Sequence, residues 1–385
     1  NAVTGIYVNP RQDGEDWERP ASVELIYPDG RTGFSINAGV RLRGGVSRSP
    51  ANPKHSFRLF FRAEYGAAKL RYPLFEDEGA DTFDKIDLRT SQNFSWNFSS
   101  AANATWLDDI FSRDMMRAMG RNYSRGRFYH LYLNGVYWGL YQTDERIEAN
   151  YGESYFGGGD EEYDAIKSDN DNGQIYATDG TVTGYTSLWG SVVQGMANAT
   201  NYYKLQGLLP DGTRTAAYPQ WLDADNIADY MLSVFFTGNR DMPIGPPGGD
   251  NMPRNMVAVC NRVRPRGVQF VTHDAEHSLL YSGGLSANRV SVALKTQFGQ
   301  VVNFTPWWLH IQLMSNSEYR VRFADRVQKH FIDTQVLSAT ASVARLRARA
   351  QEIDLAIIAE SARWGDYLTP ATPRTRDTDW VPAVN

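Results

Sequence analysis

The stretch that organises this sequence is GNRDMPIGPPGGDNMPRNMVAVCNRVRPRGVQFVTHDAEHS, residues 238–278. An apolar helix is predicted to end at Gly238, just before Asp241. After a loop rich in Pro and Gly, one predicted strand carries Asn255, and a second strand leads into Asp274. Oxygen-bearing side chains at the ends of regular elements hold their geometry well enough for metal-assisted chemistry.

Length and composition describe a folded protein. Of its 385 residues, 42% are hydrophobic and 13% aromatic, which excludes a disordered chain. This length predicts one large two-lobed domain or two domains with sizeable cores. The formal net charge of -5 gives no electrostatic footprint for nucleic acid, so no nucleic-acid partner is expected. The short basic run over residues 262–266 is interpreted as a solvated face.

Cysteine content and glycosylation motifs bear on where the protein works. The single cysteine, Cys260, lies in an apolar run, which predicts a buried core residue and excludes a disulfide framework or a cysteine-based zinc site. No apolar run approaches the roughly 18 residues that span a bilayer, so no membrane span is expected. The first residue is Asn rather than Met, which is compatible with removal of a signal peptide. A secreted or cell-surface location is favoured by six Asn-x-Ser/Thr motifs, which begin at Asn93, Asn97, Asn103, Asn122, Asn198 and Asn303.

The first part of the chain is predicted to be rich in strands. Patterns of alternating apolar residues predict strands over residues 21–27, 38–43, 56–61 and 86–89. A Gly/Ser-rich loop joins the second of these strands to the third, and a lysine lies just before the third strand. Backbone N–H groups in such a loop can cradle phosphates while the lysine neutralises them. The candidate nucleotide-binding residues here are therefore Gly44, Gly45, Ser47, Arg48 and Lys54. A hairpin with an incidental lysine is the alternative.

A carboxylate on a predicted packing face raises a question of charge pairing. Helical spacing predicts a helix over residues 105–119, with Asp114 on the same face as Ile110 and Phe111. Such a carboxylate needs a cationic partner, because an unpaired buried charge is costly. Lys54 is one candidate partner. The alternatives are exposure at the edge of the face or pairing with Arg113, Arg117 or Arg121.

The clearest local signal is a hairpin. Asn134-Gly135 separates two aromatic-rich segments, residues 128–133 and 136–141, and this dipeptide is typical of a type I′ turn. The second segment runs towards Glu145 and a helical start, which is interpreted as a crossover between two lobes.

The later part of the chain is predicted to be mainly helical. Asp223 is a suitable N-cap for a helix whose apolar residues repeat with helical spacing as far as Phe235. Trp307 lies in another helical segment and is interpreted as core rather than as a sugar platform. A further helix is predicted around residues 343–357, and the tail over 369–385 has no apolar period and is interpreted as a surface wrap or linker.

Several kinds of metal or acid–base chemistry remain open on these residues. His273 and His277 have the i, i+4 spacing of a zinc site, although a helix would have to begin abruptly after the strand, so His273 is interpreted as packing near or orienting a metal-binding Asp. Residues 169–172 (DNDN) lack the spacing of an EF-hand, and a surface loop is favoured. A hydrolase with paired carboxylates would draw on Asp241, Asp274 and Glu276.

Phosphoryl transfer accounts for more of the sequence than these alternatives. It needs a phosphate cradle, a lysine, Mg2+ held by Asp and Asn oxygens, and a carboxylate that positions the acceptor hydroxyl. The chain supplies such parts in a workable order: the loop at 44–49, then Lys54, Asp241, Asn255 and Asp274.

At these residues the sequence resembles the spore-coat CotH-like family of secreted or surface-associated atypical kinases, over about residues 21–366. Residues 39–48 (GVRLRGGVSR) resemble its arginine-glycine-x-serine loop, and residues 53–58 (PKHSFR) resemble its lysine strand. The hairpin LYLNGVYWGLY, followed by Glu145-Arg146-Ile147, is similar to the family's hairpin. Asn239-Arg240-Asp241 is similar to its catalytic Asn-x-Asp, Arg254-Asn255 to its paired Asn, and residues 273–276 (HDAE) to its Trp-Asp-x-Asp metal motif.

The resemblance implies an α+β, atypical protein kinase-like fold with two lobes, the first β-rich and the second mainly helical. The expected divisions are an N-lobe over residues 1–145, a C-lobe over 146–368 and a tail over 369–385. It also implies Mg2+-ATP (or Mn2+-ATP) binding and phosphoryl transfer to Ser or Thr of secreted or cell-surface proteins. The implied roles are catalysis or metal coordination by Asp241, nucleotide binding by the loop residues together with Lys54, Asp114 and Glu145, and metal binding by Asn255, Asp274 and Glu276.

Three departures from the family pattern keep other functions open. Arg254 replaces the first Asn of the paired motif, Glu276 replaces the second Asp of the metal motif, and a Pro/Gly insertion separates Asp241 from Asn255. A kinase fold that has lost catalysis and serves in surface adhesion or coat assembly is therefore an alternative. A carbohydrate-active enzyme that uses the Asp and Glu residues and the abundant Trp is a further one.

Overall fold

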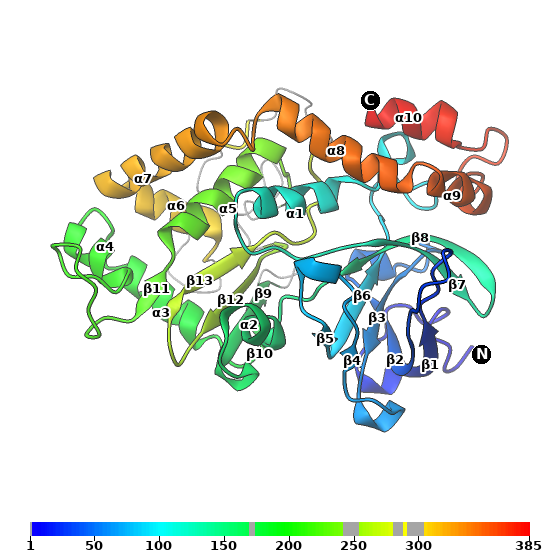
Figure 1. Ribbon diagram of the computed structural model, residues 1–385, viewed down its shortest axis with the longest axis horizontal. Helices are drawn as coiled ribbons and strands as arrows, with labels where there is room; N and C mark the ends of the chain where they lie inside the picture. The colour runs from blue at the N-terminus through cyan, green and yellow to red at the C-terminus, as the bar shows by residue number, and fades with distance from the viewer. Residues whose placement is uncertain (1, 169–173, 242–253, 280–287, 291–303) are drawn as a thin grey trace. The chain divides into compact units, whose positions relative to one another are not determined.

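A computed structural model describes residues 2–168, 174–241, 254–279, 288–290 and 304–385. These residues form two compact units (Figure 1). Unit 1 comprises residues 1–107, 125–146 and 348–385, and unit 2 comprises residues 108–124 and 147–347. Both units are discontinuous in sequence, which differs from the expected divisions after residues 145 and 368. The hypothesis of calcium ligands at residues 169–172 concerns residues that lie outside the described ones.

Unit 1 is built on a six-stranded antiparallel sheet with the order β1-β2-β3-β6-β8-β7. The strands are β1 (Arg19–Glu24), β2 (Ser35–Arg43), β3 (Ser56–Phe60), β6 (Lys85–Arg89), β7 (Phe128–Leu133) and β8 (Val136–Asp144). A small hairpin pairs β4 (Leu70–Arg71) with β5 (Thr82–Phe83). Leu59 pairs with Ile86 across the sheet, and both pack in a core cluster with Phe83. The strands predicted in this part of the chain are confirmed, with ends that shift by a few residues.

The predicted hairpin is confirmed at its turn. Strand β7 pairs with β8, and the two residues between them, Asn134 and Gly135, have φ values of 51° and 80°. Positive φ at both central residues is the requirement of a type I′ turn, which matches the right-handed twist of the flanking strands. The second strand of the hairpin ends at Asp144, so Glu145 directly follows it.

The end of the chain also belongs to unit 1. It contains α9 (Ala356–Trp364), a helical turn over Arg376–Trp380 and the short helix α10 (Val381–Val384). Trp380 is buried and its indole Nε1 donates to the Thr105 carbonyl at 2.9 Å. The segment predicted as a surface wrap or linker is therefore anchored to unit 1 through Trp380. A search for apolar periodicity does not detect such an anchor, because it depends on one side chain.

Unit 2 combines a second sheet with helices. The sheet has the order β10-β9-β12-β13-β11 and is antiparallel except where β11 runs parallel to β13. Its strands are β9 (Tyr163–Ser168), β10 (Ile175–Asp179), β11 (Gln220–Leu222), β12 (Val257–Asn261) and β13 (Arg266–Val271). The helices are α1 (Asp108–Ala118), α2 (Ala149–Phe156), α3 (Thr183–Val192), α4 (Ala199–Leu205), α5 (Ala224–Thr237), α6 (Pro306–Met314) and α7 (Ser317–Gln328). Helix α8 (Ala339–Ile353) contains the change from unit 2 to unit 1.

Alternation along β12 shows that both faces of this sheet are covered. Ala258 and Cys260 belong to the main core of the unit, whereas Val257 and Val259 belong to a second cluster with Tyr151 of α2. Side chains of successive strand residues point to opposite faces, so the apolar run over residues 257–260 is buried on both. The prediction that Cys260 is a buried core residue is confirmed.

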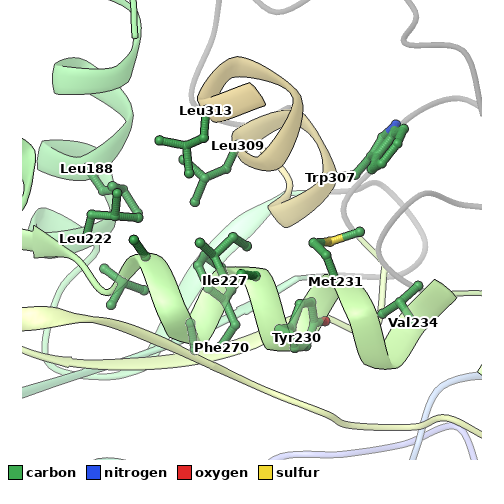
Figure 2. Packing of buried hydrophobic residues seen from close by; sticks show 14 of the residues in the cluster. Leu188, Leu222, Ile227, Tyr230, Met231, Val234, Phe270, Trp307, Leu309 and Leu313 are labelled. Atoms are coloured by element: carbon green, nitrogen blue, oxygen red, sulfur yellow. The ribbon is translucent and has the colours of Figure 1, made fainter. Parts of the chain in front are cut away.

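Helix α5 is the centre of the main core. Ile227, Tyr230, Met231 and Val234 line one side of it, and Figure 2 shows them among side chains that include Phe270 of β13 and Leu309 of α6. The Asp223 carboxylate accepts the Asn226 N–H at 2.9 Å, and Gly238 ends the helix with a φ of 63°. The predicted limits of this helix are confirmed, as is the prediction that Trp307 is core.

The architecture is thus mixed α+β, as predicted. Unit 1 is rich in strands, and unit 2 combines a five-stranded sheet with helices. No helix in the described part of the chain combines the length and the apolar run that a bilayer crossing requires.

Candidate active site

The end of α5 fixes Asp241. The Asn239 N–H donates to the Val234 carbonyl at 3.2 Å and the Gly238 N–H donates to the Phe235 carbonyl at 3.3 Å, which is the hydrogen-bond pattern of a Schellman cap. The buried Asn239 then turns its side chain forward, and its Oδ1 accepts the Asp241 N–H at 3.0 Å. The first residue of the Asn-Arg-Asp motif therefore has a structural role, because Asn239 orients the backbone of Asp241 two positions later.

Asn255 holds Asp241 from the other side of the Pro/Gly insertion. Its Nδ2 donates to Asp241 Oδ2 at 3.1 Å and to the Asp241 carbonyl at 3.3 Å. The sequence predicts Asn255 within a strand, and this is wrong in detail, because β12 begins at Val257. Asn255 instead has a φ of 48°, a left-handed conformation that Asn tolerates better than most residues. This turn is what directs the amide to Asp241 rather than into the sheet.

Asp274, the next of these residues along the chain, interacts electrostatically with Asp241. It follows β13 and has a φ of 54°, so two of the predicted metal ligands occupy the left-handed region. Burial raises the pKa of the Asp241 carboxyl, and the Asp274 carboxylate raises it further, whereas His277, Arg254 and the Asn255 hydrogen bond act in the opposite direction. The two carboxylates therefore share one local environment. Non-glycine residues held in sparsely populated conformations cluster at functional sites.

The donor set fits some metals and not others. In the described part of the chain, no three His, Cys, Asp or Glu side chains gather closely enough to hold a metal ion. His273 and His277 therefore do not complete a zinc site there, and Asp241, Asp274 and the buried Glu276 do not form a three-carboxylate group. Mg2+ is usually held by one or two carboxylates, with waters and substrate phosphates completing its octahedron. The Asp274 carboxylate and the Asn255 amide oxygen are donors of the kind that Mg2+ accepts, and Asp241 interacts with both residues.

Lys54, in unit 1, is fully buried in a network that sequence patterns do not reveal. Its Nζ lies 2.6 Å from Glu360 Oε1 and donates to the Leu140 carbonyl at 3.0 Å, while Glu360 Oε2 accepts the Leu140 N–H at 2.7 Å. Gly139 makes room for the pair, since a Cβ at its position would lie 2.6 Å from Lys54 Cε. Burial lowers the pKa of Lys54, and the Glu360 carboxylate opposes that effect. Glu360, rather than Asp114, is the carboxylate that pairs with Lys54.

The other predicted nucleotide-binding residues have defined places. The loop after β2 forms a short 3-10 turn over Val46–Arg48, in which the Ser47 carbonyl accepts Asn52 Nδ2 at 2.8 Å. Arg48 Nη1 lies 3.2 Å from Asp13 Oδ2. Glu145 is buried and pairs with Arg125 at 2.8 Å. Asp114 lies in unit 2, where its charge raises the pKa of Arg345, although burial lowers that pKa overall.

Comparison with known proteins places the chain in a family. Residues 40–380 match the family model described as CotH kinase protein. The chain belongs to the CotH family. This match covers nearly all of the sequence and confirms the resemblance drawn from its motifs. A search of curated proteins finds no match.

Two residues of this CotH chain that the motifs do not mark also bear on the site. Glu360 lies three residues after Ile357 and four before Trp364, so all three occupy one buried face of α9. A carboxylate on an apolar helical face was therefore a signal that could have been used. Asp109 of α1 is buried, and its Oδ1 accepts the Ala275 N–H at 2.8 Å. Its contact is with the backbone, which no side-chain motif reports.

Proposed function

We propose that this CotH-family chain is a protein kinase that transfers the γ-phosphoryl group of Mg2+-ATP to Ser or Thr hydroxyls of secreted or cell-surface proteins. The observation that carries the proposal is the arrangement of Asp241, Asn255 and Asp274, in which two carboxylates share an environment and the amide is hydrogen-bonded to the first of them. The proposal includes a kinase-like two-lobed fold, with unit 1 as the strand-rich lobe and unit 2 as the mainly helical lobe.

The residues divide the chemistry between them. Asp274 and Asn255 would hold Mg2+ (or Mn2+), and the bound ion would neutralise charge on the transferring phosphoryl group. Asp241 positions the acceptor hydroxyl and accepts its proton. As the hydroxyl oxygen bonds to the γ-phosphorus, the bond from that phosphorus to the β-phosphate oxygen breaks and ADP leaves. Asn255 fixes the Asp241 carboxylate, so that its second oxygen can face the acceptor.

The Lys54–Glu360 pair supports the same proposal. Protein kinases use a lysine of the strand-rich lobe, paired with a glutamate of a helix, to hold the nucleotide phosphates. In this chain such a pair is present in unit 1 at 2.6 Å. Both side chains are fully buried, so a phosphate could reach the Lys54 ammonium only after a local rearrangement at Glu360.

Phosphate labelling tests the assignment. Purified protein would be incubated with γ-labelled ATP, Mg2+ and a Ser/Thr-rich model protein. Asp241→Ala and Asp274→Ala should each reduce labelling at least about a hundredfold, because each removes a group that acts at the transferring phosphoryl. Asp211→Ala is the control, since Asp211 is an exposed carboxylate of the same unit. Unchanged labelling in both site variants would remove these two residues from the active site.

One observation favours a second candidate function. Arg254 Nη1 lies 3.9 Å from Asp241 Oδ1, where a cation of the protein can compete with a metal ion. A CotH-family chain that has lost phosphoryl transfer and serves as a surface adhesion or coat-assembly module would have this feature. Absence of any Mg2+-dependent thermal shift with ATP, together with binding to a cell-surface partner, would decide for this candidate.

A further inference from the structure

We infer that Asp109 of α1 is a positioning residue that fixes the backbone of Asp274 through the N–H of Ala275. The consequence for metal binding rests on the proposed function, since it depends on Asp274 as a metal ligand. The inference about backbone geometry rests only on contacts within unit 2, which contains both segments.

The contact joins a buried charge to a buried amide. Asp109 is 6% exposed and Ala275 is fully buried, and Asp109 Oδ1 accepts the Ala275 N–H at 2.8 Å. A carboxylate acceptor makes a hydrogen bond roughly twice as strong as a neutral one. The peptide unit that it holds connects Ala275 to Asp274, whose φ of 54° is costly for a residue with a side chain. Such a conformation persists only where the surrounding structure determines it.

Asp109 is itself held by a charged partner on its own helix. It lies in the first turn of α1, where the helix dipole favours a negative charge. Its Oδ2 lies 3.1 Å from Arg113 Nη2, one turn later on the same helix. Arg113 is also buried, and its Nη1 donates to the Ser124 carbonyl at 3.3 Å and to Ser124 Oγ at 3.2 Å. The acceptor that faces Ala275 is therefore fixed from the helix and from the segment after it.

The segment after Asp274 is anchored on two sides. On the α1 side, the hydroxyls of Ser112 and Ser278 lie 3.3 Å apart, and both are buried. On the α5 side, the Arg240 N–H donates to the His277 carbonyl at 3.0 Å, and the Leu279 N–H donates to the Thr237 carbonyl at 2.9 Å. Asp274 is thus placed beside Asp241 by a backbone segment that both helices hold. Of these contacts, that of Asp109 with the Ala275 N–H is the nearest to Asp274 in sequence.

The test compares two Asp109 variants with a matched control. Asp109→Ala removes the acceptor and the charge, while Asp109→Asn removes the charge and keeps an oxygen at the same position. Asp164→Ala is the control, because Asp164 is also a fully buried carboxylate of unit 2. It accepts the Thr181 N–H at 2.7 Å and pairs with Arg262 at 2.9 Å.

Two measurements are made on each folded variant, namely hydrogen exchange over residues 272–279 and Mn2+ affinity by calorimetry. Asp109→Ala should speed exchange in that segment and raise the Kd for Mn2+ about tenfold or more, the usual effect of losing a group that orients a metal ligand. Asp109→Asn should show smaller changes of both kinds. Asp164→Ala should lower the thermal midpoint without selectively changing either quantity.

The outcomes separate the two claims. The inference would be overturned if hydrogen exchange over residues 272–279 were as slow in both Asp109 variants as in the wild type. It would also be overturned if this exchange were no faster in the Asp109 variants than in Asp164→Ala. A second outcome is that exchange is faster in Asp109→Ala but the wild-type protein binds no Mn2+. This outcome would confirm the positioning role and count against the proposed function instead.

Discussion

At the scale of single residues, Arg254 is one of the charged groups that act on Asp241. Its Nη1 lies 3.9 Å from Asp241 Oδ1, and both side chains are 29% exposed, so the pair is a weak one. In the proposed function Arg254 competes with Mg2+ for Asp241, so Arg254→Asn removes that competitor, and it introduces the paired Asn that the family resemblance implies. Because exposed ion pairs contribute about 0.2–1 kcal/mol, the affinity for Mg2+-ATP should rise by a factor of about 1.4 to 5. Calorimetric titration measures this.

The control for this prediction is Arg264→Asn, which removes an exposed arginine of the same unit that pairs with Glu162 at 2.6 Å. It should leave nucleotide affinity unchanged. Weaker binding of Mg2+-ATP in Arg254→Asn would contradict the prediction and would indicate that Arg254 itself contacts the phosphates.

The sequence identifies the candidate site residues better than the residues that position them. Asp241, Asn255 and Asp274 could be selected because oxygen ligands follow the ends of predicted elements, and the structure brings Asn255 and Asp274 to Asp241. The partner of Lys54 could not be selected in this way. Glu360 lies 306 positions later in the chain, and local patterns carry no information on which remote carboxylate meets a buried lysine.

Helix α5 illustrates the element scale, because one carboxylate joins it to its neighbours. Asp229 is fully buried and its Oδ1 accepts Arg326 Nε at 2.8 Å, while its Oδ2 lies 2.5 Å from Arg121 Nε. His330 Nε2 lies 3.0 Å from Oδ1. Burial alone would raise the pKa of Asp229, but hydrogen bonds from His330 and Arg326 and the charge of Arg121 outweigh it and lower the pKa to about 2.

Removal of this carboxylate should destabilise the protein strongly at neutral pH. Asp229→Ala removes the nearest carboxylate from two arginines that then keep only longer contacts with Asp225, and loss of one partner of a buried ion pair costs about 3–5 kcal/mol in the free energy of unfolding. A depressed folded pKa contributes stability that is present above the ordinary value of 3.8 and is lost as the pH falls towards about 2. Denaturant unfolding at pH 7, 4 and 2.5 should therefore show the difference between wild type and variant shrinking only below about pH 4. A difference that stays constant across this range would contradict the account.

At the scale of the whole molecule, sequence patterns describe the elements but not their grouping. The Asn-Gly hairpin and the caps of α5 could be predicted, because each depends on residues within one turn of the chain. The composition of the two units could not. Residues 108–124 belong to unit 2 and residues 348–385 to unit 1, an assignment that depends on packing between remote segments such as Trp380 on Thr105. A prediction that divides the chain into consecutive segments cannot describe units made of separate segments.

The return of the chain end to unit 1 gives a prediction that separates folding from catalysis. Glu360→Ala leaves the Lys54 ammonium buried without its carboxylate and should cost about 3–5 kcal/mol in the free energy of unfolding. Combining Lys54→Met with Glu360→Gln removes both charges and keeps an oxygen acceptor for the Leu140 N–H. This double variant should unfold within about 1 kcal/mol of the wild type, because a buried ion pair contributes little net stability over an uncharged replacement.

The same double variant tests whether Lys54 serves the nucleotide. If its ammonium contacts phosphate during turnover, the double variant should be as stable as the wild type and still lose ATP-dependent labelling and most of its affinity for Mg2+-ATP. Stability would be followed by denaturant unfolding, and affinity by titration of the same preparation. Full nucleotide affinity in the stable double variant would instead show that Lys54 and Glu360 act only in holding α9 to β8, and the phosphate contact would then have to come from other groups, such as Arg48 and the backbone of its loop.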